Sequence, residues 1–229
     1  MIHYDILDNG YIDLLDTFGD ELTIVNAARV SFGVEHDTLT EGDKKLIKYL
    51  YDNKHFSPFR HVFLRIRIHA PEAIMRQIAK HVIGIEATSN TVPVKDMAFN
   101  EISGRYKKVE EYYIPDEWRI QSMDNKQCSD GVFDNNKQVE LKTMYNSALA
   151  LCVSTYEKMV EMGVAKEQAR LILPLSQYTT VLWTASLQAI LNFISLRDHD
   201  HAQTEIKLYA QAMRDIIKNR FPTLYDIWL

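Results

Sequence analysis

The 229-residue chain is 46% hydrophobic, 25% charged and 10% aromatic, which suffices for one sizeable core and excludes a disordered or collagen-like chain. Its 31 acidic residues outnumber its 26 basic ones, and the formal net charge of −5 excludes a global positive field that would hold a nucleic-acid polymer. No apolar run approaches the roughly 20 residues of a membrane-spanning helix, and no charged-then-apolar leader opens the chain, so we expect a cytoplasmic protein.

The first half of the chain alternates between strand and helix patterns. Residues 61–69, HVFLRIRIH, alternate strictly between apolar and polar side chains, which predicts a strand. Thr40 and Asp43 resemble a capping pair that begins a helix, and Pro71 suits the first turn of a helix that runs to about Gly84. The other expected elements are a short strand at 2–7, a turn at Asn9-Gly10, a helix at 21–30 and a loop at 85–98.

The second half is mostly helical by its spacing. We expect a long helix at 135–162 that stops at Gly163, a shorter helix that ends at Pro174, a strand at 177–184 and a helix at 185–196. Asp200 with Gln203 resembles a capping pair for a last helix through Lys218. The polar stretch 121–138 is expected to be mobile. No internal repeat or linker is visible, so residues 1–229 are interpreted as a single domain.

The densest polar cluster is the run NEISGRY at 100–106. Arg105 supplies a fork of donors, Ser103 a hydroxyl, and Gly104 lets backbone N–H groups approach an anion. This run suits a phosphate and its neighbouring sugar. The alternative is a turn with a surface ion pair.

Two further arginines lie in apolar surroundings. On the helix that follows Pro71, polar side chains form two rows, and the two residues of each row are four positions apart. Arg170 and Arg197 are expected to be semi-buried, which requires a partner. That partner is either an internal carboxylate, such as Glu101 or Asp198, or a bound nucleotide monophosphate. The two rows, which can converge on one ligand, are Arg76 with Lys80 and Gln77 with His81.

Neither the cysteines nor the histidines predict a metal site. Cys128 and Cys152 form no CxxC pair, so we expect no disulfide framework and no structural zinc. The run from Arg197 to His201 has metal-ligating residue types, but ligands one or two residues apart point in different directions on a helix. A helix-capping or ligand-contacting role suits Asp200 and His201 better.

Four segments together resemble the flavin-dependent thymidylate synthases, and they occur in the right order over nearly the whole chain. The family hallmark is Arg-His-Arg, seven residues, then Ser, whereas this chain has Lys80-His81-Val82 and about thirteen additional residues before Ser103. Ser186 and Gln188 stand where members commonly have Asn and Arg. The segments that carry the resemblance are DILDNGYIDLLDTFGDELTIVNAARVSF, HFSPFRHVFLRIRIHAPEAIMRQ, FNEISGRY and ARLILPLSQYTTVLWTASLQAILNFISLRDHDHAQTEI.

The resemblance implies reductive methylation of deoxyuridine monophosphate (dUMP) to dTMP, with 5,10-methylenetetrahydrofolate as the one-carbon donor, FAD as the flavin and NADPH as its reductant. Arg197 would face the uracil and stabilise negative charge on it, as the catalytic residue. The matching substrate-binding positions are Gln77, Lys80, Glu101, Ser103, Gly104, Arg105, Arg170 and Arg197. The matching cofactor-binding positions are His55, Ser57, Lys80, His81, Glu101, Ser186, Gln188 and Asn192, with His55 in the folate and nicotinamide region.

The resemblance also implies an α/β fold of the α+β type, a single domain with a central, mostly antiparallel sheet covered by helices. It implies a homotetramer with active sites between subunits, which would place Arg105 and Arg170 on different chains around one nucleotide. The unrelated thymidylate synthases use a catalytic cysteine. Neither Cys128 nor Cys152 has an activating neighbourhood, in agreement with the flavin route.

Three other functions stay open. The departures at Val82 and Gln188 remove two cationic groups that help to hold the flavin, although Lys95, Thr88, Ser89 or Asn90 in the insertion can offset the loss. An enzyme with altered cofactor use would transfer a methyl or hydroxymethyl group to C5 of a pyrimidine nucleotide. The remaining alternatives are a non-catalytic nucleotide-binding homologue and a metal-dependent phosphohydrolase built on His199 and His201.

Overall fold

A computed structural model describes residues 2–81, 97–105, 110–125 and 129–228. The centre is a five-stranded sheet in the order β1-β2-β3-β7-β4, in which every neighbouring pair is antiparallel. This confirms the expected α+β fold. The strands of this sheet are β1 (Ile2–Ile6), β2 (Gly10–Phe18), β3 (Phe63–Pro71), β7 (Tyr178–Ser186) and β4 (Met97–Glu101), and a separate hairpin pairs β5 (Arg119–Gln121) with β6 (Ser129–Val132).

The alternating pattern of β3 decides which face of the sheet is covered. Leu64, Ile66 and Ile68 are fully buried, whereas Arg65 and Arg67 are exposed. The buried side chains join those of three helices that pack on the sheet, α3 (Glu72–Ile78), α6 (Leu187–Arg197) and α7 (Thr204–Arg220). The predicted strand at 61–69 is confirmed with a shift of two residues, because His61 ends the short 3-10 helix η2 (Ser57–His61).

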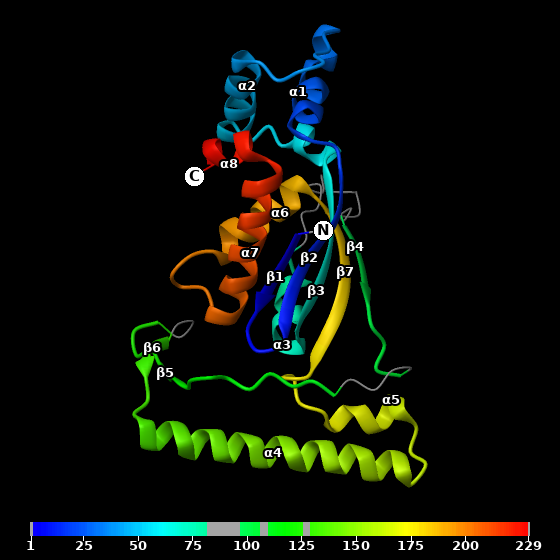
Figure 1. The fold of residues 1–229 in the computed structure, drawn as a ribbon, viewed down its shortest axis with the longest axis vertical. Coiled ribbons are helices and arrows are strands. Elements are labelled where there is room, and N and C mark those ends of the chain that lie inside the picture. Colours follow the sequence, from blue (N-terminus) through cyan, green and yellow to red (C-terminus); the bar gives the residue numbers. More distant parts are fainter. Residues whose placement is uncertain (1, 82–96, 106–109, 126–128, 229) are drawn as a thin grey trace, which may run out of the picture.

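The remaining helices lie at the two ends of the sheet (Figure 1). The upper end carries α1 (Glu21–Arg29), η1 (Val30–Phe32), α2 (Glu41–Asp52) and α8 (Pro222–Trp228). The lower end carries α4 (Asn135–Glu161), α5 (Lys166–Ala169) and η3 (Arg170–Ile172). The capping box of Thr40 and Asp43 at α2 is confirmed, and α4 ends two residues before Gly163.

Several local predictions were wrong. Asp200 does not cap α7, since it pairs with Lys207 at 2.9 Å and the N-cap residue Gln203 makes no capping hydrogen bond through its side chain. The sequence did not predict β2, β4, β6 or α8, whereas the start of α4 agrees with the helix expected from residue 135. Most of the expected loop at 85–98 lies outside the described residues. In the described part of the chain no helix combines the length and apolar character needed to cross a bilayer.

Candidate active site

A cavity of about 770 Å³ opens at the lower end of the sheet, where β4 ends. Pairing of Glu101 with Val181 places the end of β4 beside β7, and the chain then turns through Ser103 and Gly104. A Cβ added to Gly104 would lie 3.7 Å from Arg170 Nη1, so the glycine brings its backbone against the guanidinium. The cavity thus joins five predicted substrate-binding residues of one chain, Glu101, Ser103, Gly104, Arg105 and Arg170. The expectation that Arg105 and Arg170 come from different chains was wrong.

The cavity carries positive and negative groups close together. The Thr179 hydroxyl donates to Glu101 Oε1 at 2.7 Å, which holds this carboxylate in place. Glu72 of α3 lines the same cavity, and burial, followed by the nearby charge of Glu101, raises its pKa. The backbone N–H of Arg105 donates to Ser103 Oγ at 3.3 Å. Such a mixture of arginines, hydroxyls and carboxylates suits a ligand that has both a phosphate and sugar hydroxyls.

Arg170 differs from its expected setting. Its side chain is exposed, as is its neighbour Leu171, because η3 lies at the surface. Within the described ranges no ion pair involves Arg170, and Glu101 accepts from Thr179 instead. The alternative in which Glu101 forms an ion pair with Arg170 is therefore not realised in the described chain, although the charge of Arg170 acts on Glu72 in the same cavity.

A second cluster forms where the end of α3 meets the end of α6. Arg197 Nε donates to His81 Nε2 at 2.8 Å, and His81 Nδ1 lies 2.8 Å from the carbonyl oxygen of Gln77. A carbonyl only accepts, so the proton of the imidazole is on Nδ1 and Nε2 is the acceptor. Burial, helped by the charge of Arg197, lowers the pKa of His81, which keeps the ring neutral.

Arg197 is half-buried, as expected, but its neighbour Asp198 does not pair with it. Asp198 instead accepts from Arg214 and from Gln211 Nε2, the latter at 3.2 Å. In the described part of the chain no side chain is bonded to the terminal nitrogens of Arg197. Gln77, predicted to bind the substrate, donates to Gln203 Oε1 at 2.6 Å and lies outside the 770 Å³ cavity.

The residues predicted to bind the flavin fall on neighbouring elements. Gln188 and Asn192 are half-buried and four residues apart on α6, and the exposed His55 and Ser57 lie where η2 begins, with η2 packed against α6. Lys80 is exposed just after α3. Amide, hydroxyl and ammonium donors of this kind fit the pyrophosphate and ring edge of a flavin dinucleotide.

Two predicted flavin residues use their polar atoms elsewhere. Ser186 is buried and caps α6 by accepting from the backbone N–H of Ala189 at 3.3 Å. Both ring nitrogens of His81 are bonded within the chain. Both signals were present in the sequence: a serine directly before a helix is a typical N-cap, and the four-residue spacing of Gln77 and His81 matches the observed contact. Val82, Thr88, Ser89, Asn90 and Lys95 lie outside the described residues.

The sequence interpretation missed several residues that line the cavity. Glu72 and Arg76 lie on the same face of α3, one turn before Lys80, and this spacing was the available signal. Thr179 and Gln177 precede the centre of β7. Tyr156 comes from α4 and is the one buried residue of that helix in the described chain.

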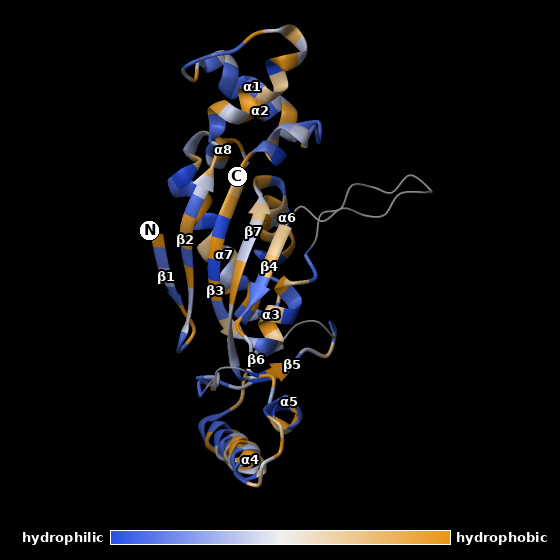
Figure 2. Ribbon diagram, turned by 90° about the vertical axis from the view of Figure 1, so that its right-hand side faces the viewer, coloured by the Kyte–Doolittle hydropathy of each residue, from blue (hydrophilic) through white to orange (hydrophobic). Residues whose placement is uncertain are grey.

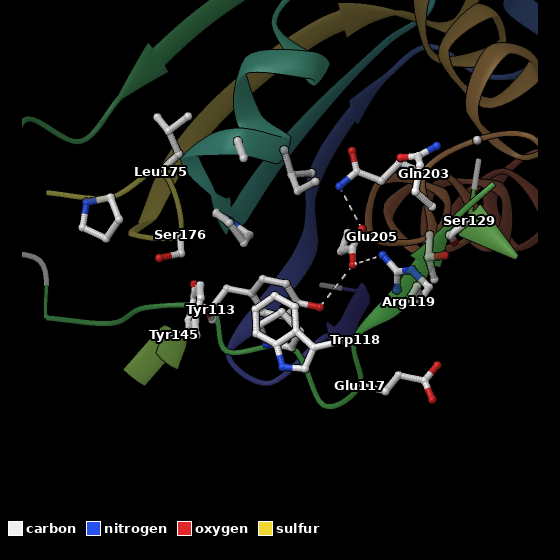
Figure 3. A pocket seen from close by; sticks show the side chains of 18 of the residues that line it. Tyr113, Glu117, Trp118, Arg119, Ser129, Tyr145, Leu175, Ser176, Gln203 and Glu205 are labelled. Atoms are coloured by element: carbon white, nitrogen blue, oxygen red, sulfur yellow. Dashed lines mark hydrogen bonds and ion pairs between the residues drawn. The ribbon is translucent and has the colours of Figure 1, made fainter. Parts of the chain in front are cut away.

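A smaller cavity of about 640 Å³ lies beside the first, and the segment of Pro174 and Leu175 lines both. Its polar centre is Glu205, which accepts from Arg119, from Gln203 at 2.8 Å and from Tyr113 at 3.3 Å (Figure 3). The histidines predicted as an alternative metal site lie side by side, since the backbone N–H of His201 donates to His199 Nδ1 and the two ring centroids are 6.3 Å apart. In the described ranges no three metal-ligating side chains cluster.

The antiparallel sheet with helices packed on it, with an arginine-lined cavity at one end, defines the chain as an α+β protein. The sequence model of the thymidylate synthase complementing protein family matches residues 13–223, so the chain belongs to this family.

Named relatives support the same assignment. The chain is 37% identical to the flavin-dependent thymidylate synthase of Kosmotoga olearia over 98% of its own length and 92% of the relative. It is also 37% identical to a flavin-dependent thymidylate synthase of Thermus thermophilus, with 95% and 74% covered. Among solved structures it is similar to the UMP/dUMP methylase PolB of Streptomyces cacaoi bound with 5-Br UMP, with a TM-score of 0.81, 26% identity and coverage of 98% and 95%.

Proposed function

We propose that this protein is a flavin-dependent thymidylate synthase, which methylates dUMP to dTMP with a one-carbon unit from 5,10-methylenetetrahydrofolate. The observation that carries the proposal is the cavity in which Arg170, without an ion-pair partner in the described chain, lies against the backbone of Gly104 beside Ser103 and Arg105. A guanidinium fork and approachable backbone amides are the groups that bind a nucleotide phosphate.

The cavity residues divide the nucleotide between them. Arg105, Arg170 and Ser103 bind the phosphate, and Glu101, held by Thr179, accepts from a sugar hydroxyl. The terminal nitrogens of Arg197 donate to a carbonyl of the uracil and stabilise the negative charge that develops on the ring. Charge stabilisation by a fixed donor needs no covalent nucleophile from the protein.

Arg197 and the 770 Å³ cavity do not meet within one chain, so the proposed site needs a second copy. We therefore propose a homotetramer in which Arg197 and Gln77 of one subunit face the cavity of another. The long helix α4 carries exposed apolar side chains, where a second copy can pack, and its ribbon mixes hydrophobic and hydrophilic residues (Figure 2). These exposed residues are Val139, Met144 and Leu151.

The residues on α6 and η2 support the flavin part of the proposal. Gln188, Asn192 and Ser57 would hold FAD by hydrogen bonds, and Lys80 would contact its pyrophosphate. When bound, reduced FAD supplies the hydride that completes the methyl group. NADPH as the reductant and a folate position near His55 complete the proposal, and we place the enzyme in the cytoplasm, where these metabolites are made.

The deciding experiment is an absorbance titration of the purified protein with FAD, with and without dUMP, followed by mass analysis of the product. We expect a flavin spectrum that responds to dUMP and a product that carries a methyl group. A product heavier by one oxygen would instead identify a hydroxymethyltransferase. If the protein binds the nucleotide but forms no product, and if Arg197→Ala changes only the affinity for the nucleotide, the protein is a non-catalytic homologue.

A second candidate function is methylation of the ribonucleotide UMP. It is favoured by the similarity to PolB, which is described as a UMP/dUMP methylase and was solved with 5-Br UMP and with 5-Br dUMP. The same assay with UMP in place of dUMP separates the two substrates. A higher kcat/KM for UMP would establish the second function.

A further inference from the structure

The α3–α6 junction fixes the guanidinium of Arg197 more firmly than a surface arginine is usually fixed. Its Nε donates to His81 at 2.8 Å, and the opposite edge of that imidazole is held by the Gln77 carbonyl. His81 is only 7% exposed, and the ring of Phe193 meets its imidazole edge-on at 5.0 Å. Because the Nε bond fixes the guanidinium plane, much of the rotamer entropy of Arg197 is already lost before a ligand binds.

The partner of Arg197 is also unusual in its charge. A carboxylate in this position would neutralise the guanidinium, but a neutral imidazole accepts a hydrogen bond and leaves the positive charge intact. The nearest acidic side chain along the sequence, Asp198, is bonded to Arg214 and Gln211. In the part of the chain that the structure describes, the terminal nitrogens of Arg197 are therefore oriented, charged and available to an electron-rich ligand.

We propose that His81 is a positioning residue that orients Arg197 toward the pyrimidine nucleotide, and that it is not a flavin ligand. The inference rests on the proposed function, because it takes the nucleotide to be the ligand of Arg197. It deepens that function by giving His81 a specific role, the orientation of Arg197. A hydrogen bond to the flavin would require His81 to give up one of its two internal hydrogen bonds.

Two substitutions separate the two edges of the imidazole. The amide of His81→Asn reaches the Nδ1 position and still donates to the Gln77 carbonyl, but it has no acceptor at the Nε2 position. The longer side chain of His81→Gln brings an amide oxygen toward Nε2, where it accepts from Arg197. We expect His81→Asn to weaken dUMP binding about tenfold, and His81→Gln to restore most of it.

The measurements are dUMP affinity by calorimetry on the FAD-loaded protein, and FAD affinity by absorbance. Both variants are expected to bind FAD within about twofold of the wild type, because His81 is not a flavin ligand in this proposal. A factor of two in affinity corresponds to less than about 0.5 kcal/mol. His3→Asn, on the surface of β1, is the matched control for loss of an imidazole. A loss of FAD affinity in His81→Asn with dUMP affinity retained would identify His81 as a flavin ligand and overturn the inference.

A double-mutant cycle shows whether His81 acts through Arg197. Arg197→Ala alone should weaken dUMP binding, and adding His81→Asn should then cost nothing more, because the group that His81 orients is gone. A further tenfold loss in the Arg197→Ala background would contradict the inference. If His81→Asn does not fold, the same double-mutant cycle is measured with His81→Leu in place of His81→Asn and with Arg197→Lys in place of Arg197→Ala.

A second readout does not involve the nucleotide. In the wild type and in His81→Gln, the Arg197 Nε–H proton should exchange slowly with water in nuclear magnetic resonance spectra, and in His81→Asn it should exchange rapidly. Fast exchange in the wild type overturns the positioning role. Slow exchange in a wild type that does not bind dUMP would instead refute the proposed function and leave the His81–Arg197 geometry intact.

Discussion

Arg170 and Arg197 belong to the same proposed nucleotide site but are held in opposite ways. Arg170 is exposed at the lower end of the molecule and lies against a glycine backbone. Arg197 is half-buried, and its Nε is bonded to a histidine that packs on Phe193. The first arginine supplies charge, whereas the second supplies charge at a fixed orientation. Substitutions near Arg170 should therefore change binding alone, and substitutions near Arg197 should change stability as well.

The largest expected effect is on stability, from Phe193→Ala. The ring is fully buried between His81 and Trp183, whose centroid is 6.0 Å away. Its removal leaves a cavity and should lower the free energy of unfolding by about 3–5 kcal/mol. Urea denaturation measures this. Leu196→Ala on the same helix, 50% exposed, is the control and should stay within about 0.5 kcal/mol. Equal effects of the two would mean that the α3–α6 junction is not packed.

At the other end, Arg170→Ala should leave stability unchanged and weaken dUMP binding about a hundredfold, which corresponds to two charged hydrogen bonds. The stability is unaffected because the exposed guanidinium makes no ion pair in the described chain. Calorimetry gives the affinity and thermal denaturation the stability. Lys166→Ala removes an exposed cation from the neighbouring α5 without touching the cavity, and it should bind dUMP normally. A comparable loss in this control would mean that only the overall charge matters.

Local signals predicted much of the fold. Strict alternation placed β3 within two residues, and the Thr40–Asp43 pair marked the start of α2, because both patterns act within a few residues. The strand β4 was missed, since its residues Met97–Glu101 are held by pairing with β7, some eighty residues further along the chain. Propensity carries no information about such a partner.

The same limit applies to the site. The run at 100–106 identified Ser103, Gly104 and Arg105 by residue type, but nothing local indicated that Arg170 joins them in the same chain. Apolar neighbours suggested that Arg170 is semi-buried, whereas the short helix η3 exposes it. The bond between His81 and Arg197 joins residues 116 positions apart, and only the packing of α3 against the core beside α6 brings it about.

The pH dependence of nucleotide binding gives a smaller effect at the junction. His81 accepts from Arg197 only while it is neutral, and its pKa is lowered by burial, so the bond is present above that pKa and is lost as the pH falls through it. Among the described residues, Arg197 is the charged group that faces the ring, from α6, and the ring otherwise contacts the Gln77 carbonyl of α3 and the ring of Phe193.

We expect dUMP affinity to fall severalfold more steeply in the wild type than in His81→Gln as the pH drops below the ordinary pKa of an imidazole, because the amide does not titrate. Comparing the two proteins at each pH cancels the titration of the phosphate itself. Identical profiles in the two proteins would show that the protonation of His81 does not affect Arg197.

The smallest expected effect returns to the cavity and concerns Glu72. Its carboxylate lies beside Glu101 and shares the cavity with Arg170, so it adds negative charge where the phosphate is proposed to bind. Glu72→Gln keeps the shape and removes that charge, and should tighten dUMP binding about two- to fivefold at neutral pH, as expected for one partly screened like charge. Because the pKa of Glu72 is raised, the affinity of the wild type for dUMP should approach that of the variant as the pH falls and the carboxyl becomes protonated.

Glu167→Gln on α5, exposed and outside the cavity, is the control. Weaker binding in Glu72→Gln would instead show that this carboxylate accepts a hydrogen bond from the nucleotide, and the cavity would then resemble the junction in orienting its ligand as well as attracting it.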